Sequence, residues 1–255
     1  MALTIAVAGK GGVGKTSFCA ILIRWLIDKN KRPVLAVDAD PNSNLAETLG
    51  LKLQGRTVSD IVSQTKKHGG IPPDMSQDEF IISELDACLS GSTHFDLVAI
   101  GNPDGPGCYC FPNNLMKKHL TKLSQKYIAI VMDNEAGLEH ISRGTTTENV
   151  DALFILSDIS QRSVRSAGRV YALTKELKTP VKSVFFVITR GQETDIAALG
   201  AEIDKTGLSV SGVVPFDRMI TEYELAGRAL YELPDDAPSV IAVEEILNKT
   251  IGDSF

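Results

Sequence analysis

The sequence predicts an α/β protein with a doubly wound, mostly parallel sheet flanked by helices. Short apolar runs recur along the 255 residues, and most are apolar at consecutive positions, as in strands that helices cover on both faces. Helical patterns alternate with these runs, which favours a parallel sheet with right-handed crossovers. The length suits one large domain, so we expect a single domain over residues 1–255.

The expected strands are apolar runs of five or six residues at 3–8, 33–37, 97–101, 127–132, 152–156, 183–188 and 210–214. The expected helices lie between them at 15–29, 114–124, 162–177, 196–205 and 220–229, with a short amphipathic helix at 240–251. Residues 54–94 interrupt the alternation, because they are polar and contain Gly-Gly and Pro-Pro pairs. We interpret them as an irregular insertion of short helices and loops.

The charge and the distribution of apolar residues argue against a nucleic-acid-binding protein and against a membrane protein. The net charge of −6 argues against non-specific nucleic-acid binding, which rewards clustered Lys and Arg. No apolar run reaches the roughly 18 residues that a membrane-spanning helix needs, and the first residues do not resemble a signal peptide. We therefore expect a cytoplasmic protein without membrane contact. Cys19 and Cys88 lie in or near apolar stretches and are expected to be buried.

A phosphate-binding loop follows the first expected strand. Residues 9–16 fit the pattern G-x-x-x-x-G-K-[ST] and open a helix. Backbone N–H groups and the helix N-terminus would surround phosphate oxygens, Lys15 would reach the β- and γ-phosphates, and Thr16 would bind Mg²⁺. The expected nucleotide-binding residues here are Gly9, Lys10, Gly11, Gly12, Val13, Gly14, Lys15, Thr16 and Ser17.

Carboxylates follow two of the expected strands. Asp38 and Asp40 come after the second strand, and Asp133 ends the apolar strand at 127–132. The carboxyl ends of parallel strands beside a phosphate loop form the crevice where ligands bind. We expect Asp38 and Asp133 to support Mg²⁺ and Asp40 to orient the attacking water. The alternative is that these residues only cap helices or strand ends.

Two further cysteines, Cys108 and Cys110, are separated by one residue in a Gly- and Pro-rich segment. They supply two ligands, whereas a closed Zn²⁺ site usually has four. A two-fold dimer would bring four sulfurs together, which could hold Ni²⁺, Zn²⁺, Cu⁺ or an Fe–S cluster. Cys-x-Cys is a weak signal, and on spacing alone incidental cysteines are the favoured interpretation.

The loop with its additional Lys10 resembles the deviant Walker A motif of the MinD/ParA/nitrogenase-iron-protein superfamily. This resemblance implies that Lys10 reaches the partner's nucleotide in an ATP-dependent homodimer, and that Lys10, Lys15 and Asp40 serve ATP hydrolysis. It also implies base contacts from Thr189 and Arg190 and from Pro215 and Asp217. Thr189 stands where an Asn is usual, and Thr lacks the paired donor and acceptor of an amide. The preference for ATP over GTP therefore rests on resemblance.

The Gly-Cys-Tyr-Cys loop and the segment at 131–144 resemble CooC-type ATPases, which assist nickel insertion into carbon monoxide dehydrogenase. The resemblance spans essentially the whole chain. It implies ATP/ADP and Mg as cofactors, with Ni or Zn at Cys108 and Cys110 shared between subunits. It also implies a nickel client enzyme, either carbon monoxide dehydrogenase or acetyl-CoA synthase. Glu139 and His140 either transmit the nucleotide state to the metal loop or form a surface pair.

Two other functions compete. A positioning ATPase of the MinD/ParA kind would act on a membrane or DNA, but membrane binders carry a basic amphipathic C-terminal helix, whereas this tail is acidic. A reductase with a dimer-bridging Fe–S cluster, similar to the nitrogenase iron protein, would take its cysteines from two separated loops, whereas Cys108 and Cys110 are adjacent.

Overall fold

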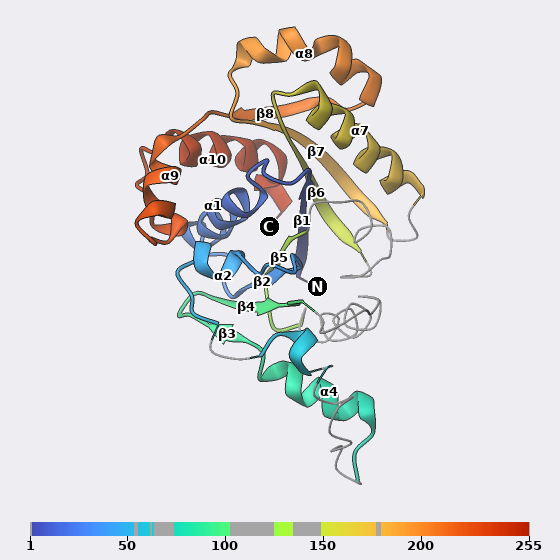
Figure 1. Ribbon diagram of the computed structural model, residues 1–255, viewed down its shortest axis with the longest axis vertical. Coiled ribbons are helices and arrows are strands. Elements are labelled where there is room, and N and C mark those ends of the chain that lie inside the picture. Colours follow the sequence, from blue (N-terminus) through green and yellow to red (C-terminus); the bar gives the residue numbers. More distant parts are fainter. Residues whose placement is uncertain are drawn as a thin grey trace.

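The computed structural model describes residues 2–53, 56–61, 63, 74–102, 125–134, 149–176 and 180–254. One eight-stranded sheet runs through this part of the chain in the order β3-β4-β2-β5-β1-β6-β7-β8 (Figure 1). Every neighbouring pair is parallel except β3 with β4, which is antiparallel. The prediction of a mostly parallel α/β sheet is therefore confirmed.

All seven expected strands form, and their ends lie within two residues of those expected. They are β1 Leu3–Gly9, β2 Val34–Asp38, β4 Phe95–Ala99, β5 Ala129–Asp133, β6 Val150–Asp158, β7 Val181–Thr189 and β8 Val210–Val214. The sequence did not predict the two-residue edge strand β3 Ser90–Gly91. It forms because the chain turns at Ser92, whose hydroxyl accepts hydrogen bonds from the backbone of His94 and Phe95.

The principal helices are α1 Lys15–Asp28, α7 Gln161–Glu176, α8 Glu193–Thr206, α9 Arg218–Leu225 and α10 Pro238–Thr250. Helix α8 begins three residues earlier than expected because Gln192 and Asp195 form a capping box. Helix α9 ends four residues earlier than expected, where Gly227 takes a left-handed backbone conformation. The helix expected at 114–124 lies outside the described residues.

Shorter elements fill the connections. Helix α2 Leu45–Thr48, which the sequence did not predict, follows β2. Within the expected insertion, α4 Gln77–Asp86 begins with a capping box between Ser76 and Glu79. Two short 3₁₀ helices, Leu230–Glu232 and Gly252–Ser254, flank α10.

Helices cover both faces of the sheet, which explains the unbroken apolar runs. Along β1, Ile5 and Val7 pack into one core cluster, while Ala6 and Ala8 pack into the other. Helices α1 and α10 lie on the first face, and α7 and α8 lie on the second (Figure 1). A strand buried on both sides has no position left for a solvated polar side chain, so the functional side chains lie at the strand ends.

Candidate nucleotide site

The loop between β1 and α1 is shaped by glycine. A Cβ on Gly9 would lie 2.4 Å from the carbonyl oxygen of Leu156 on neighbouring β6, so only glycine allows this close approach of the two strands. Gly12 and Gly14 have φ angles of 79° and 83°, a conformation that glycine adopts without strain. Gly14 caps α1 without a side-chain hydrogen bond. The first N–H groups of α1 can therefore bind an anion.

Lys15 and Thr16 begin helix α1. Lys15 is buried, with Nζ 3.4 Å from the carbonyl oxygen of Lys10. The Thr16 hydroxyl donates a 2.6 Å hydrogen bond to Oδ2 of Asp133, at the end of β5. The other oxygen, Oδ1, is buried and has no hydrogen-bond partner among the described residues. A buried carboxylate oxygen without a donor is a suitable ligand for a cation or for its bound water.

Asp38 and Asp133 lie opposite each other on the adjacent strands β2 and β5. Both side chains are buried. Burial, with the nearby charge of Asp133, raises the pKa of Asp38 from 3.8 to about 7. Burial also raises the pKa of Asp133 from 3.8 to about 6, while the hydrogen bond from Thr16 and the charge of Lys15 oppose this rise. Two buried carboxylates this close favour a proton or a divalent cation between them.

Asp38 also holds the loop that follows β2. Its Oδ1 accepts a 3.1 Å hydrogen bond from the backbone N–H of Asp40, and its Oδ2 accepts a 2.8 Å bond from that of Leu45 at the start of α2. The carboxylate of Asp40 accepts bonds of 2.9 Å from the backbone and side-chain nitrogens of Asn42. The charge of Asp40 contributes to the raised pKa of Asp133, so Asp40 lies near the buried pair.

These contacts bear on the sequence predictions for the metal and the attacking water. Thr16 and Asp133 are in direct contact, and Asp38 lies beside them. The structure adds a capping role for Asp38, which was the stated alternative, because both of its oxygens accept backbone hydrogen bonds. The Mg²⁺ and water-orienting roles remain predictions.

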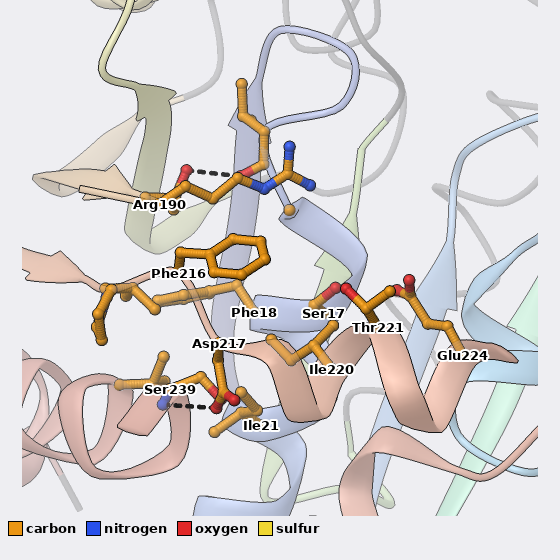
Figure 2. Close-up of a pocket in the computed structure, with 16 residues that line it drawn as sticks. Ser17, Phe18, Ile21, Arg190, Phe216, Asp217, Ile220, Thr221, Glu224 and Ser239 are labelled. Carbon is orange, nitrogen blue, oxygen red and sulfur yellow. Dashed lines mark hydrogen bonds between the residues drawn. The ribbon is translucent and has the colours of Figure 1, made fainter. Parts of the chain in front are cut away.

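A pocket lies beside the phosphate loop, where β7 and β8 end (Figure 2). It is lined from α1, from the two strand ends, from α9 and from α10 by Val13, Gly14, Ser17, Phe18, Ile21, Thr189, Arg190, Val214, Pro215, Phe216, Asp217, Ile220, Thr221, Glu224, Ser239 and Val243. It includes all four residues that were expected to contact the base. A pocket that joins a phosphate loop and is mostly apolar suits the base and ribose of a nucleotide.

The side chains of two of those four residues form hydrogen bonds within the protein. The Thr189 hydroxyl donates to the carbonyl oxygen of Val13 at 2.8 Å and lies 3.2 Å from that of Ser157. Asp217 caps α9 by accepting a bond from the backbone N–H of Met219, and it accepts two more from the backbone N–H and hydroxyl of Ser239. These bonds explain why Thr189 and Asp217 are buried. A direct contact of either with a base stays a prediction.

The site prediction missed nine of the sixteen pocket residues, among them Phe216, Thr221 and Glu224. Phe216 stands between two predicted residues, but an aromatic residue at a strand end resembles an ordinary core residue. Thr221 and Glu224 are spaced three apart, so they share one face of α9, which the sequence alone could not orient toward the loop.

The cysteine pair Cys108 and Cys110, with Glu139 and His140, lies outside the described residues. Within the described ranges, no group of three or more His, Cys, Asp or Glu side chains is arranged to hold a metal ion. Cys19 and Cys88 are buried, as expected, and both are free thiols. Burial raises the pKa of both. No helix in the described part of the chain is long and apolar enough to cross a membrane.

Comparison with known proteins also finds nucleotide-binding relatives. The model of the CobQ/CobB/MinD/ParA nucleotide binding domain matches residues 4–230. The chain is 38% identical over 256 residues to an uncharacterized ATP-binding protein of Methanocaldococcus jannaschii, covering 99% of this chain and 100% of that protein. It is 29% identical over 243 residues to the carbon monoxide dehydrogenase accessory protein CooC of Rhodospirillum rubrum, covering 91% and 90% respectively.

Solved structures show the same fold. The septum site-determining protein MinD from Pyrococcus horikoshii, complexed with Mg-ADP, superposes with a TM-score of 0.72 at 20% sequence identity. The match covers 100% of this chain and 98% of that one. At this identity the likeness supports the fold alone.

Proposed function

The chain belongs to the CobQ/CobB/MinD/ParA family of nucleotide-binding domains, and we propose that it is a Mg²⁺-dependent ATPase that assists metal insertion into a nickel enzyme. The observation that carries the ATPase is the contact between Thr16 and Asp133 beside an uncapped helix N-terminus. A hydroxyl at the end of a phosphate loop and a carboxylate at the end of a neighbouring strand are the residue types that hold Mg²⁺ on a bound triphosphate.

Each residue of the proposed site has a task that its position supports. The N–H groups of the loop would bind the β- and γ-phosphates, and Lys15 would add its positive charge. Thr16 would hold Mg²⁺, with Asp38 and Asp133 supporting its ligands. When bound, the metal neutralises charge that develops on the phosphates. Asp40, steadied by Asn42, would orient the attacking water.

The metal-insertion role depends on the cysteine pair and on similarity. The accessory protein CooC, at 29% identity, carries carbon monoxide dehydrogenase in its name. We propose that Cys108 and Cys110 of two subunits bind one Ni²⁺, or Zn²⁺, as cargo in a homodimer. Four soft thiolates suit either metal. ATP binding and hydrolysis would change the dimer, with Lys10 reaching the partner's nucleotide, and so release the metal to carbon monoxide dehydrogenase or acetyl-CoA synthase.

The proposal is tested by metal titration. Ni²⁺ is added to reduced, anaerobic protein, with stoichiometry followed by calorimetry and mass by light scattering. A Cys108→Ala/Cys110→Ala variant is measured beside it, and a Cys19→Ala/Cys88→Ala variant serves as the matched control because those thiols are buried. We expect one tightly bound metal per dimer, lost only in the first variant.

Three results would count against the proposal. Equal metal binding by wild type and the first variant would remove the metal-delivery role and leave a positioning ATPase. A brown protein that absorbs near 400 nm would favour the reductase with a bridging Fe–S cluster. Absence of phosphate release from Mg-ATP, with or without metal, would contradict the ATPase itself.

A further inference from the structure

Asn134 is a buried polar residue at the point where β5 ends beside the acidic site. It follows Asp133 directly, and only 2% of its surface is exposed. An amide that loses its contact with water costs free energy unless it finds hydrogen-bond partners, so an apolar residue would serve better if the position only had to be filled. A buried amide that is hydrogen-bonded instead fixes the geometry of the groups around it.

Two donors of Asn134 share one acceptor, the carbonyl oxygen of Val7 on β1. The backbone nitrogen lies 3.2 Å from this oxygen, and the side-chain Nδ2 lies 3.0 Å from it. The backbone bond continues the pairing of β5 with β1, in which Val7 stands opposite Asp133. Its length is at the long limit for hydrogen bonds of this type, so the side-chain bond reinforces the ladder at its last position.

The Val7 carbonyl does not need the amide in order to be satisfied. The backbone N–H of Asn134 already donates to it, so the oxygen would keep a partner if the side chain were apolar. The second bond therefore acts on position, because it restrains the residue that follows Asp133 at the place where the chain leaves the sheet.

Asp133 is restrained by β2 on its other side. Its carbonyl oxygen accepts a 2.9 Å hydrogen bond from the backbone N–H of Ala39. Strand β5 lies between β1 and β2 (Figure 1), so the backbone around Asp133 is tied to both neighbours. These ties set the place of its carboxylate, in which Oδ2 is bonded to Thr16 and Oδ1 is buried without a partner among the described residues.

We propose that Asn134 is a positioning residue for metal binding: by tying the end of β5 to β1, it holds the carboxylate of Asp133 in place beside Thr16. The inference rests on the proposed function, because it requires the Mg²⁺ site at those two residues. Residues that orient a metal-binding group raise metal affinity without touching the metal, and their loss typically costs about tenfold or more.

Two variants remove the amide in different ways. Asn134→Leu keeps a side chain of similar shape without a donor, and Asn134→Ala removes the side chain beyond Cβ without adding bulk. Tyr127→Phe is the matched control. Tyr127 is a buried residue just before the opposite end of β5, and its hydroxyl donates a 2.6 Å hydrogen bond to Asp96. This control also loses one hydrogen bond of the sheet, but at the end away from the metal site.

The measurement is the affinity of the full chain for ADP by calorimetry, in excess Mg²⁺ and again in excess EDTA. The ratio of the two affinities gives the contribution of the metal, which a purely structural role of Asn134 would leave unchanged. We expect both Asn134 variants to bind Mg-ADP about tenfold more weakly than wild type and to bind metal-free ADP with unchanged affinity. Tyr127→Phe should bind both as wild type does. Thermal unfolding checks that each variant is folded at the temperature of the titration.

Several results would overturn the inference. One is a ratio within about twofold of the wild-type value in a folded Asn134 variant. Another is an equal loss of affinity with and without metal, which would mean general damage to the phosphate loop. An equal effect of Tyr127→Phe on the ratio would assign the change to the stability of β5. Loss of folding in both Asn134 variants would show that the amide serves the fold rather than the metal.

The same data separate this inference from the proposed function. A wild type whose affinity for ADP rises with Mg²⁺, together with variants that behave alike, would keep the metal site and remove only the role of Asn134. A wild type that binds ADP equally with and without Mg²⁺ would contradict the proposed metal site, and the positioning role would fall with it.

Discussion

The hydroxyl of Thr16 donates a 2.6 Å hydrogen bond to the carboxylate of Asp133, 117 positions away along the chain. This bond joins the first turn of α1 to the end of β5, and it lies beside Asp38 on the neighbouring strand. The phosphate loop and the acidic strand ends therefore form one site, and the following predictions test its parts.

Removing either partner of the Thr16–Asp133 hydrogen bond should reduce metal-dependent activity more than it reduces the stability of the fold. We expect Asp133→Asn and Thr16→Ala each to lower the apparent affinity for Mg²⁺ in ATP hydrolysis by at least about tenfold. Thr16→Ser keeps the hydroxyl and serves as the control. The measurement is phosphate release against Mg²⁺ concentration at saturating ATP. Unchanged Mg²⁺ dependence in both variants would exclude these residues from the metal site.

The buried carboxyl of Asp38 should make stability depend on pH. Its pKa is raised to about 7, so the folded state holds the proton more tightly than the unfolded state does. This contribution to stability is fully present below about pH 3.8 and is lost as the pH rises through about 7. A shift of this size corresponds to at most about 4 kcal/mol.

Urea unfolding between pH 5 and pH 8, without metal or nucleotide, checks this expectation. The free energy of unfolding should fall with pH in the wild type and should fall less steeply in Asp38→Asn. Saturating Mg-ADP should also weaken the pH dependence of the free energy of unfolding, because a bound cation replaces the proton. Identical slopes in wild type and variant would mean that Asp38 is not the titrating group.

Asp217 should matter for stability because it caps α9 and also accepts hydrogen bonds from Ser239 in the first turn of α10. Asp217→Ala removes the cap of α9 and leaves the buried Ser239 without its acceptor. We expect a loss of about 2–3 kcal/mol in the free energy of unfolding. Asp236→Ala, an exposed acid in the loop before α10, should change stability by less than about 0.5 kcal/mol. Equal effects of the two substitutions in chemical denaturation would contradict the assigned capping role.

Two glycines should respond in opposite ways to alanine. A Cβ at Gly9 would meet the Leu156 carbonyl oxygen at 2.4 Å, whereas one at Gly200, inside α8, would meet nothing within 4 Å. Gly9→Ala should displace the phosphate loop and abolish nucleotide binding. Gly200→Ala should stabilise the protein by about 0.5–1 kcal/mol. Thermal unfolding and ADP titration of both variants measure these effects, and normal ADP binding by Gly9→Ala would disprove the steric argument.

Local sequence patterns predicted most of the fold. The apolar runs marked all seven long strands, since burial on both faces requires apolar residues at consecutive positions. The glycine pattern marked the loop between β1 and α1, because its backbone angles are accessible mainly to glycine. By contrast, the edge strand β3 and the one-turn helix α2 are too short to give a periodic signal, and each is held by local hydrogen bonds such as those to Ser92 and from Leu45 to Asp38.

The sequence by itself determined the α/β class, the phosphate loop and the acids at the strand ends, because each depends on residue types at short spacing. Only the tertiary structure decided how these residues meet. Pairing of β2 with β5 brought Asp38 beside Asp133, and the packing of α9 and α10 beside β8 directed Phe216 into the pocket while Asp217 turned inward. These relationships join segments far apart in the chain, so strand order and helix packing set them rather than local pattern.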